Sequence, residues 1–87
     1  MSEIHNEKVS VLSIYDREKG SYMPKKVRWG GRTLSISYVG YHHAFREGRK
    51  LVHIFSVVTD QNLSLRLRHD TETLHWILEE TIDEFAS

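Results

Sequence analysis

The sequence predicts an α+β fold, in which a strongly curved antiparallel sheet of about five strands carries a C-terminal helix on one face. Three observations lead to this prediction. Apolar and polar residues alternate along much of residues 9–69, which is typical of strands. Short turn sequences separate the alternating runs, so consecutive strands should lie side by side as a barrel-like meander. After residue 70 the apolar residues adopt the spacing of a helix.

The first predicted strand covers residues 9–15. Its apolar pattern changes phase after Val11, which indicates a bulge or a change of buried face. The polar run at residues 16–21 is a turn, and Pro24 suits the start or the edge of the second strand because it cannot donate a ladder hydrogen bond. Gly30-Gly31 then predicts a two-residue hairpin, since such turns need positive φ angles.

Three further strands follow. "RTLSISYVGYHH" alternates clearly, and Gly40 within it indicates a bulge. "LVHIFSVVTD" is apolar on both faces, so it should be the central strand. "LSLRLRH" alternates strictly, with its leucines inward and its arginines outward. Turns are expected at Glu47-Gly48 and at residues 60–62.

The tail is predicted to be a helix over residues 71–85, with Asp70 or Thr71 as its N-cap. One stripe of this helix is apolar: Leu74, Ile77, Leu78, Ile82 and Phe85. Trp76 falls on the opposite, acidic side, where it either packs laterally or anchors an interface with a partner. The alternative is an all-β, barrel-like fold in which the tail is a sixth strand and Trp76 is buried.

The predicted core combines the inward residues of the strands with the apolar stripe of the helix. Its members are Leu34, Ile36, Tyr38, Ile54, Val58, Leu65, Leu67, Leu74, Ile77, Leu78 and Ile82.

Length and composition limit the class of protein. Eighty-seven residues make one small domain, which we place at residues 9–87 after a flexible polar start at residues 1–8. The absence of cysteine excludes a disulfide scaffold and thiolate metal sites. No apolar run approaches the roughly 20 residues that cross a bilayer, and no signal peptide is evident, so we expect a cytoplasmic protein.

Catalytic and metal-binding patterns are not evident in the sequence. The serines lie in no strained glycine elbow, and the adjacent His42 and His43 should point to opposite faces of a strand. We therefore expect no enzyme, no metal site and no cofactor.

Charge is the most distinctive property of the chain. The net charge is zero, but residues 1–69 carry all 12 lysines and arginines, whereas residues 70–87 carry half of the 12 acids and no lysine or arginine. Nine cations are expected to form one basic sheet surface: Lys25, Lys26, Arg28, Arg32, Arg46, Arg49, Lys50, Arg66 and Arg68. Four aromatic residues are interleaved with them: Tyr22, Tyr38, Tyr41 and Phe45.

Cations for phosphates and rings for bases are the combination found in proteins that bind single-stranded nucleic acids. The sequence therefore predicts a non-catalytic binding module that contacts single-stranded nucleic acid or a nucleic-acid-processing complex. The alternative is a protein-interaction module that uses the acidic helix, including self-association of helix on basic sheet as a homodimer. The ligand, the oligomeric state and the pathway do not follow from the sequence.

Several positions together resemble a small bacterial domain family of unknown function. The family occurs as freestanding proteins and at the end of the polymerase-like accessory protein of bacterial mutagenic repair. The similar positions lie within residues 24–83: Pro24, Val27, Trp29, the glycine before Arg32, the arginine-bearing hairpin, Phe55-x-Val57-x-Thr59, Leu67, Asp70, Thr73, Trp76, Leu78 and Asp83. The resemblance implies that the tail is a strand returning from a hairpin. Leu74 stands where the family has a glycine, and "YHHAF" replaces its tryptophans.

Overall fold

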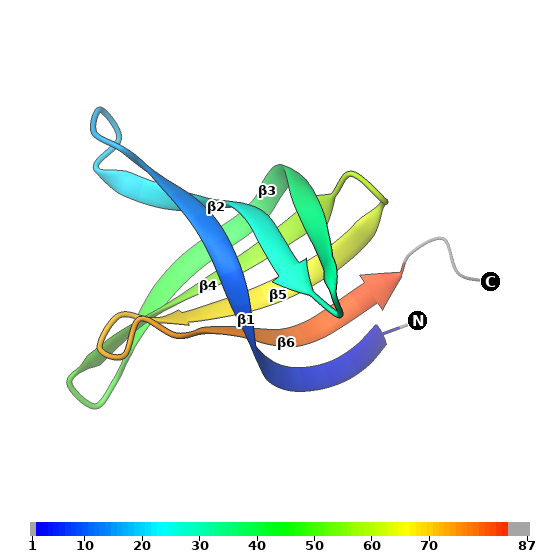
Figure 1. Ribbon diagram of the computed structural model, residues 1–87. Coiled ribbons are helices and arrows are strands. Elements are labelled where there is room, and N and C mark those ends of the chain that lie inside the picture. Colours follow the sequence, from blue (N-terminus) through cyan, green and yellow to red (C-terminus); the bar gives the residue numbers. More distant parts are fainter. Residues whose placement is uncertain (1, 84–87) are drawn as a thin grey trace.

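The computed structural model describes residues 2–83 and shows an all-β barrel (Figure 1). Consecutive strands pair in antiparallel fashion, and β1 also pairs with β6, which closes the barrel. The strands are β1 (Ser2–Asp16), β2 (Ser21–Trp29), β3 (Arg32–Glu47), β4 (Lys50–Thr59), β5 (Leu63–Asp70) and β6 (Trp76–Asp83). The meander is therefore confirmed, whereas the predicted C-terminal helix and the α+β class are wrong. Residues 2–83 contain no helix, and hence none that is long and apolar enough to cross a membrane.

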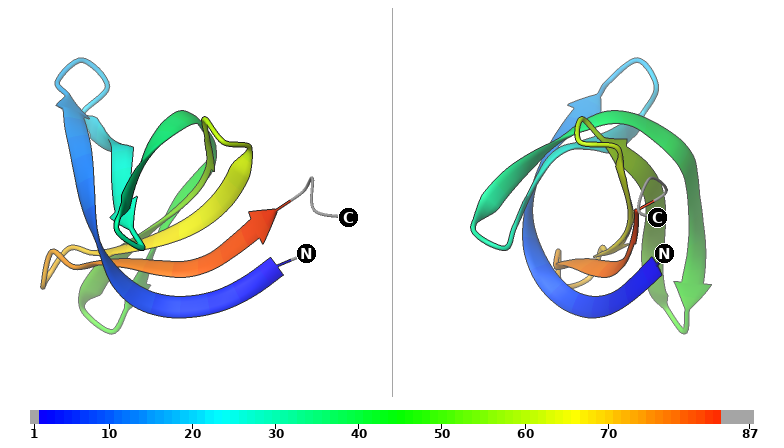
Figure 2. Two further views of the ribbon diagram at one scale, coloured as in Figure 1. Left: turned by 45° about the vertical axis from the view of Figure 1, so that its right-hand side comes forward. Right: turned by 90° about the vertical axis from the view of Figure 1, so that its right-hand side faces the viewer.

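The barrel consists of two layers that share β1 and β3. One layer runs from the second part of β3 through β4, β5 and β6 to the first part of β1. The other joins the second part of β1, β2 and residues 32–35 of β3. β1 and β3 bend from one layer into the other, and β2 crosses the larger layer at a steep angle (Figures 1 and 2). Residues 2–8, expected to be flexible, instead form the start of β1 and pair with β6.

The predicted turns and bulges are confirmed. Gly30 and Gly31 have φ angles of 60° and 76°, as a tight hairpin between β2 and β3 requires. The register between β1 and β2 shifts at Leu12/Ser13, and the register between β3 and β4 shifts at Gly40. A further shift occurs at Ser37, between Ile36 and Tyr38. These bulges decide which side of β3 each aromatic residue faces.

The loop between β5 and β6 explains why the tail is not a helix. The Asp70 Oδ1 atom accepts hydrogen bonds from the backbone N–H groups of Glu72 and Thr73, which is the pattern expected of an N-cap. The helical turn then stops at Leu74, whose φ angle is 65°. The Leu74 N–H donates to the Asp70 carbonyl at 2.7 Å, and β6 begins two residues later. The capping signal was therefore real, but it closes a single turn.

The glutamates that favoured a helix are accommodated by a bulge in β6. Leu78 pairs with Leu67 and Glu80 pairs with Arg66, so Glu79 is the extra residue. The Arg66 guanidinium contacts the carboxylates of both Glu79 and Glu80 at 3.2 Å. The bulge also turns Thr81 inward, where it is buried beside the other core-facing residues of β6.

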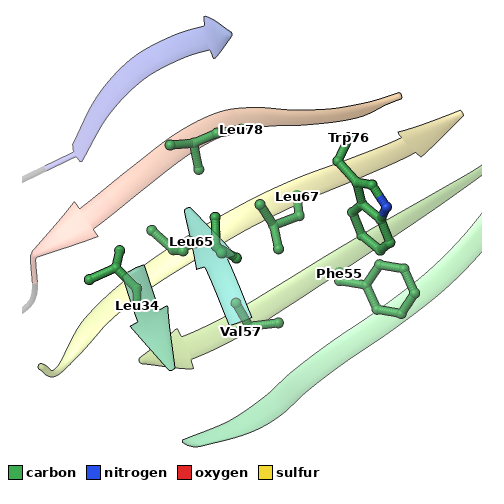
Figure 3. Packing of buried hydrophobic residues seen from close by; sticks show 8 residues of the cluster. Leu34, Phe55, Val57, Leu65, Leu67, Trp76 and Leu78 are labelled. Atoms are coloured by element: carbon green, nitrogen blue, oxygen red, sulfur yellow. The ribbon is translucent and has the colours of Figure 1, made fainter. Parts of the chain in front are cut away.

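The hydrophobic core lies between the two layers (Figure 3). It consists of Val27, Leu34, Phe55, Val57, Leu65, Leu67, Trp76 and Leu78. Two residues predicted for the core are exposed: Tyr38, which retains 61% of its accessible surface, and Leu74, which retains 68%. The bulge at Ser37 turns Tyr38 outward, and Leu74 stands in the β5–β6 loop. The prediction also placed Trp76 outside, whereas it is only 8% exposed.

Candidate nucleic-acid interface

A row of exposed rings follows the outer face of β3. Tyr38, Tyr41, His43 and Phe45 share this face because they pair with Val58, Ser56, Ile54 and Val52 of β4, which alternate with the core residues Phe55 and Val57. The Tyr41 and His43 ring centroids are 5.1 Å apart, and those of His43 and Phe45 are 6.0 Å apart. The row ends at Arg68 of β5, whose guanidinium carbon lies 5.8 Å from the centre of the Phe45 ring. Tyr41 remains 60% exposed, so flat aromatic surface is available to a ligand.

Two cations lie beside the start of the same strand. Lys26 and Arg28 project from the outer face of β2, where Lys26 pairs with Ser35 and Arg28 pairs with Thr33. Within residues 2–83, no carboxylate forms an ion pair with either of them. Because Tyr38 lies three residues beyond Ser35, the rings begin about 10 Å along β3 from Lys26.

Lys26 and Arg28 also line an open groove on the barrel wall. The groove crosses β1, β2 and β3 and has a volume of about 290 Å³. Its lining consists of Ser10, Val11, Leu12, Lys26, Arg28 and Thr33. Hydroxyl groups from two strands therefore lie beside the two cations, and such groups commonly contact phosphate and sugar oxygens.

The nine predicted cations do not form a single uniform surface. Lys50 binds Asp70 at 3.0 Å, and this pairing raises the pKa of Lys50. Arg66 binds both glutamates of the β6 bulge, and Arg68 binds Glu47 at 3.0 Å. Acids of the predicted tail therefore bind Lys50 and Arg66, an acid of β3 binds Arg68, and these three cations are partly neutralised.

The remaining predicted cations are exposed at two separate places. Lys25 and Arg32 lie in β2 and at the start of β3, near the groove-lining cations in sequence. Arg32 reaches Gln61 Oε1 at 3.4 Å and lies over the Trp29 ring. Arg46 and Arg49 lie at the β3–β4 hairpin, where Arg46 donates to the Arg49 carbonyl. Cations without ion pairs within residues 2–83 therefore stand at both ends of the aromatic row.

Trp76 lies inside the barrel and does not form part of this outer surface. Its ring centroid lies 5.6 Å from that of Phe55 (Figure 3). The Trp76 ring also stacks on His69, with the ring centroids 4.2 Å apart. The predicted role of Trp76 as an exposed interface anchor depended on the helix and is wrong. Tyr22, expected among the surface rings, also points inward, toward His53, His69 and Phe55.

The inner face near this end of the barrel holds three partly buried histidines. A hydrogen bond of 2.8 Å joins Nε2 of His42 to Nδ1 of His53. A second hydrogen bond, of 2.5 Å, joins the Tyr22 hydroxyl to Nδ1 of His69. Burial lowers the pKa of His42, His53 and His69, and raises the pKa of Tyr22 to about 12. These groups are therefore uncharged near neutral pH, and they act as packed polar members of the barrel interior. No group of acids and histidines within residues 2–83 has an arrangement that would hold a metal ion.

Comparisons with protein families, with curated proteins and with solved structures found no match to this chain. The resemblance to the bacterial domain family thus stays a prediction, and the candidate interface depends on the chain's own geometry.

The sequence pointed to three rings of the row, but it did not predict His43 or that the four rings share one face of β3. That arrangement depends on two bulges acting together. Gly40 marked one of them, and with it residues 41, 43 and 45 alternate on one face. The bulge at Ser37, which brings Tyr38 to the same face, had no distinctive residue to mark it.

Proposed function

We propose that this protein is a non-catalytic module that binds single-stranded nucleic acid along the outer face of β3. The observation that supports this most directly is the exposed row of Tyr38, Tyr41, His43 and Phe45. Aromatic faces stack on bases of any sequence, and each such contact is worth about 1–3 kcal/mol. A cytoplasmic location is part of the same proposal.

In this proposal the phosphates are bound at the groove. Lys26 and Arg28 are exposed and free of ion pairs within residues 2–83, so they can contact phosphates without first losing a carboxylate partner. Arg66 is less suited to this task because Glu79 and Glu80 already hold its guanidinium. The ligand would therefore extend from the groove at β2 along β3 toward the β3–β4 hairpin.

The protein-interaction alternative relied on an acidic C-terminal helix, and residues 76–83 form β6 in its place. Two acids of this strand, Glu79 and Glu80, are instead engaged with Arg66.

The test is fluorescence anisotropy of a labelled single-stranded oligonucleotide of mixed sequence, titrated at several salt concentrations. We expect binding that weakens as salt rises, because bound cations on the nucleic acid are released by the protein's lysine and arginine. The Tyr41→Ala variant should bind roughly 5- to 150-fold more weakly, which corresponds to about 1–3 kcal/mol. Replacing both Lys26 and Arg28 by alanine should reduce the slope of log affinity against log salt by about 1.4.

Arg66→Gln is the matched control, because it removes a cation that is already paired with two glutamates. This variant should bind with nearly unchanged affinity. The proposal is refuted if micromolar protein shows no salt-sensitive binding. It is also refuted if the Tyr41→Ala variant and the groove double variant bind as well as the unaltered chain.

A further inference from the structure

β3 has a long free edge. Its residues 32–35 pair with β2, and its residues 36–47 pair with β4. Within residues 2–83, no strand pairs with the other edge of residues 36–47. The right-hand view of Figure 2 shows this part of β3 along the flank of the barrel, with no described strand beyond it. The two bulges lie before Tyr41, so the edge is regular from there to Glu47.

The hairpin turn indicates which backbone groups face outward from this edge. Glu47 pairs with Lys50 across the two-residue turn at Gly48-Arg49, so this closing pair exchanges both backbone hydrogen bonds. In an antiparallel pair such residues alternate with residues whose N–H and C=O groups point away. Arg46, Ala44 and His42 therefore present their N–H and C=O groups to the free edge.

Soluble proteins usually protect such an edge with lysine, proline, bulges or a covering segment. Residues 41–47 contain neither lysine nor proline, and they include no register shift. Their one cation and one anion, Arg46 and Glu47, cancel, so two copies of the segment would not repel each other. Most of the segment is exposed, including Ala44.

The geometry points to this edge as a homodimer interface, in which β3 of one chain pairs antiparallel with β3 of a second copy. A two-fold axis at Ala44 pairs Ala44 with itself and His42 with Arg46 of the other copy. This register uses all the outward groups and would form about six backbone hydrogen bonds. It also places His43 opposite the other copy's Phe45 on the outer face, and aromatic cross-strand pairs of this kind are favourable.

Two features of the segment suit it to a second copy of the same chain. Ala44 is the smallest residue between Tyr41 and Glu47, so two chains can approach closely at the axis. The axis is perpendicular to the joined sheet, so both aromatic rows face the same side. The dimer would thus present one doubled row of rings, although its formation does not depend on nucleic acid.

The experiment is light scattering on the full chain without nucleic acid, over a range of about 5 to 500 μM, which covers the dissociation constants expected of a small interface. The apparent mass should rise from 10.2 kDa toward twice that value. Amide hydrogen exchange at His42, Ala44 and Arg46 should slow over the same range, whereas exchange at His43 and Phe45, whose N–H groups point toward β4, should not change.

Three substitutions at one position separate dimerisation from folding. Ala44→Pro removes the outward N–H group, and Ala44→Lys places two cations at the axis. Both variants should stay monomeric at every concentration while keeping the circular dichroism spectrum of the unaltered chain. Ala44→Ser keeps the N–H group and a small side chain, so it should dimerise normally. If the Ala44→Pro variant does not fold, the Ala44→Lys variant alone tests whether the free edge of β3 forms the dimer.

The proposal is overturned if the chain remains monomeric up to the highest concentration. The partner of this edge would then be an extended peptide of another protein. A dimer that persists in the folded Ala44→Lys variant overturns the proposal as well, because the contact then lies elsewhere. Neither result bears on oligonucleotide binding, which the anisotropy titration tests separately.

Discussion

Leu74 provides the sharpest test of the fold, because a helix and a turn predict effects of opposite sign. Its φ angle of 65° lies in the left-handed region, and its side chain is 68% exposed. For an L-residue this conformation costs about 1–2 kcal/mol, whereas glycine adopts it freely. Glycine also makes the unfolded chain more flexible, and this greater entropy offsets about 0.5–1 kcal/mol of the advantage. At this position glycine should therefore be more stabilising than alanine by about 0.5–1 kcal/mol.

The chain contains its own reference for this position in the β1–β2 loop. There the Asp16 Oδ1 atom accepts from the N–H groups of Glu18 and Lys19, and the Gly20 N–H donates to the Asp16 carbonyl at 2.8 Å. Asp70 and Leu74 repeat the same arrangement in the β5–β6 loop. Gly20 has the same φ angle of 65°, and a Cβ atom there would meet no atom within 4 Å. The same left-handed backbone conformation is therefore occupied by glycine in the β1–β2 loop and by leucine in the β5–β6 loop.

The assay is urea unfolding of the unaltered chain and the Leu74→Gly and Leu74→Ala variants, with Gly20→Ala as the control. The Leu74→Gly variant should be more stable than the Leu74→Ala variant by about 0.5–1 kcal/mol, equivalent to a few degrees in Tm. Gly20→Ala should destabilise by a similar amount, and the slope with urea should not change. In a helix the order reverses, since alanine exceeds glycine by about 1 kcal/mol. A Leu74→Ala variant as stable as the Leu74→Gly variant would refute the assigned turn.

Two further predictions concern the barrel interior. Trp76→Ala should cost about 3–5 kcal/mol of unfolding free energy in urea titrations, because the ring is buried against His69 and Phe55; a loss below about 1 kcal/mol would contradict its burial. Burial lowers the pKa of His42, His53 and His69 in the folded chain. As the pH falls below 6.5, the ordinary pKa of histidine, the unfolded chain therefore takes up protons at these residues before the folded chain does. Stability should fall over this range of pH. Tm measured between pH 7.5 and about pH 5 checks this, and a Tm that is constant or rises toward acid would exclude it.

The strands before residue 70 were predictable because their signals are local. Alternating apolar residues, the glycine pair at Gly30-Gly31 and the glycine in β3 each restrict the backbone within a few residues. The structure places turns and bulges at these positions. The site was predictable only in part: Tyr38, Tyr41 and Phe45 were identified, but the partners of the basic residues depend on which strands become neighbours.

The tail was mispredicted because its local signals suit two structures. An aspartate that caps a helix makes the same hydrogen bonds when it closes a single turn, as Asp70 does. A glutamate pair disfavours a strand, but Arg66 on the adjacent strand holds both carboxylates. The spacing that resembled a helical stripe arises partly from the bulge at Glu79, which shifts the inward phase of β6.

The amino-acid sequence by itself determined the strand-rich body, the hairpin turns and the separation of charge along the chain, because each depends on residues close together in the sequence. Tertiary structure decided that the tail completes a barrel, that Trp76 is inside it and that Arg66 is neutralised while Lys26 and Arg28 are not. Burial and ion pairing depend on contacts between segments distant in the chain. The pairing of β6 with β5 and with β1 fixes these contacts, and no local propensity encodes them.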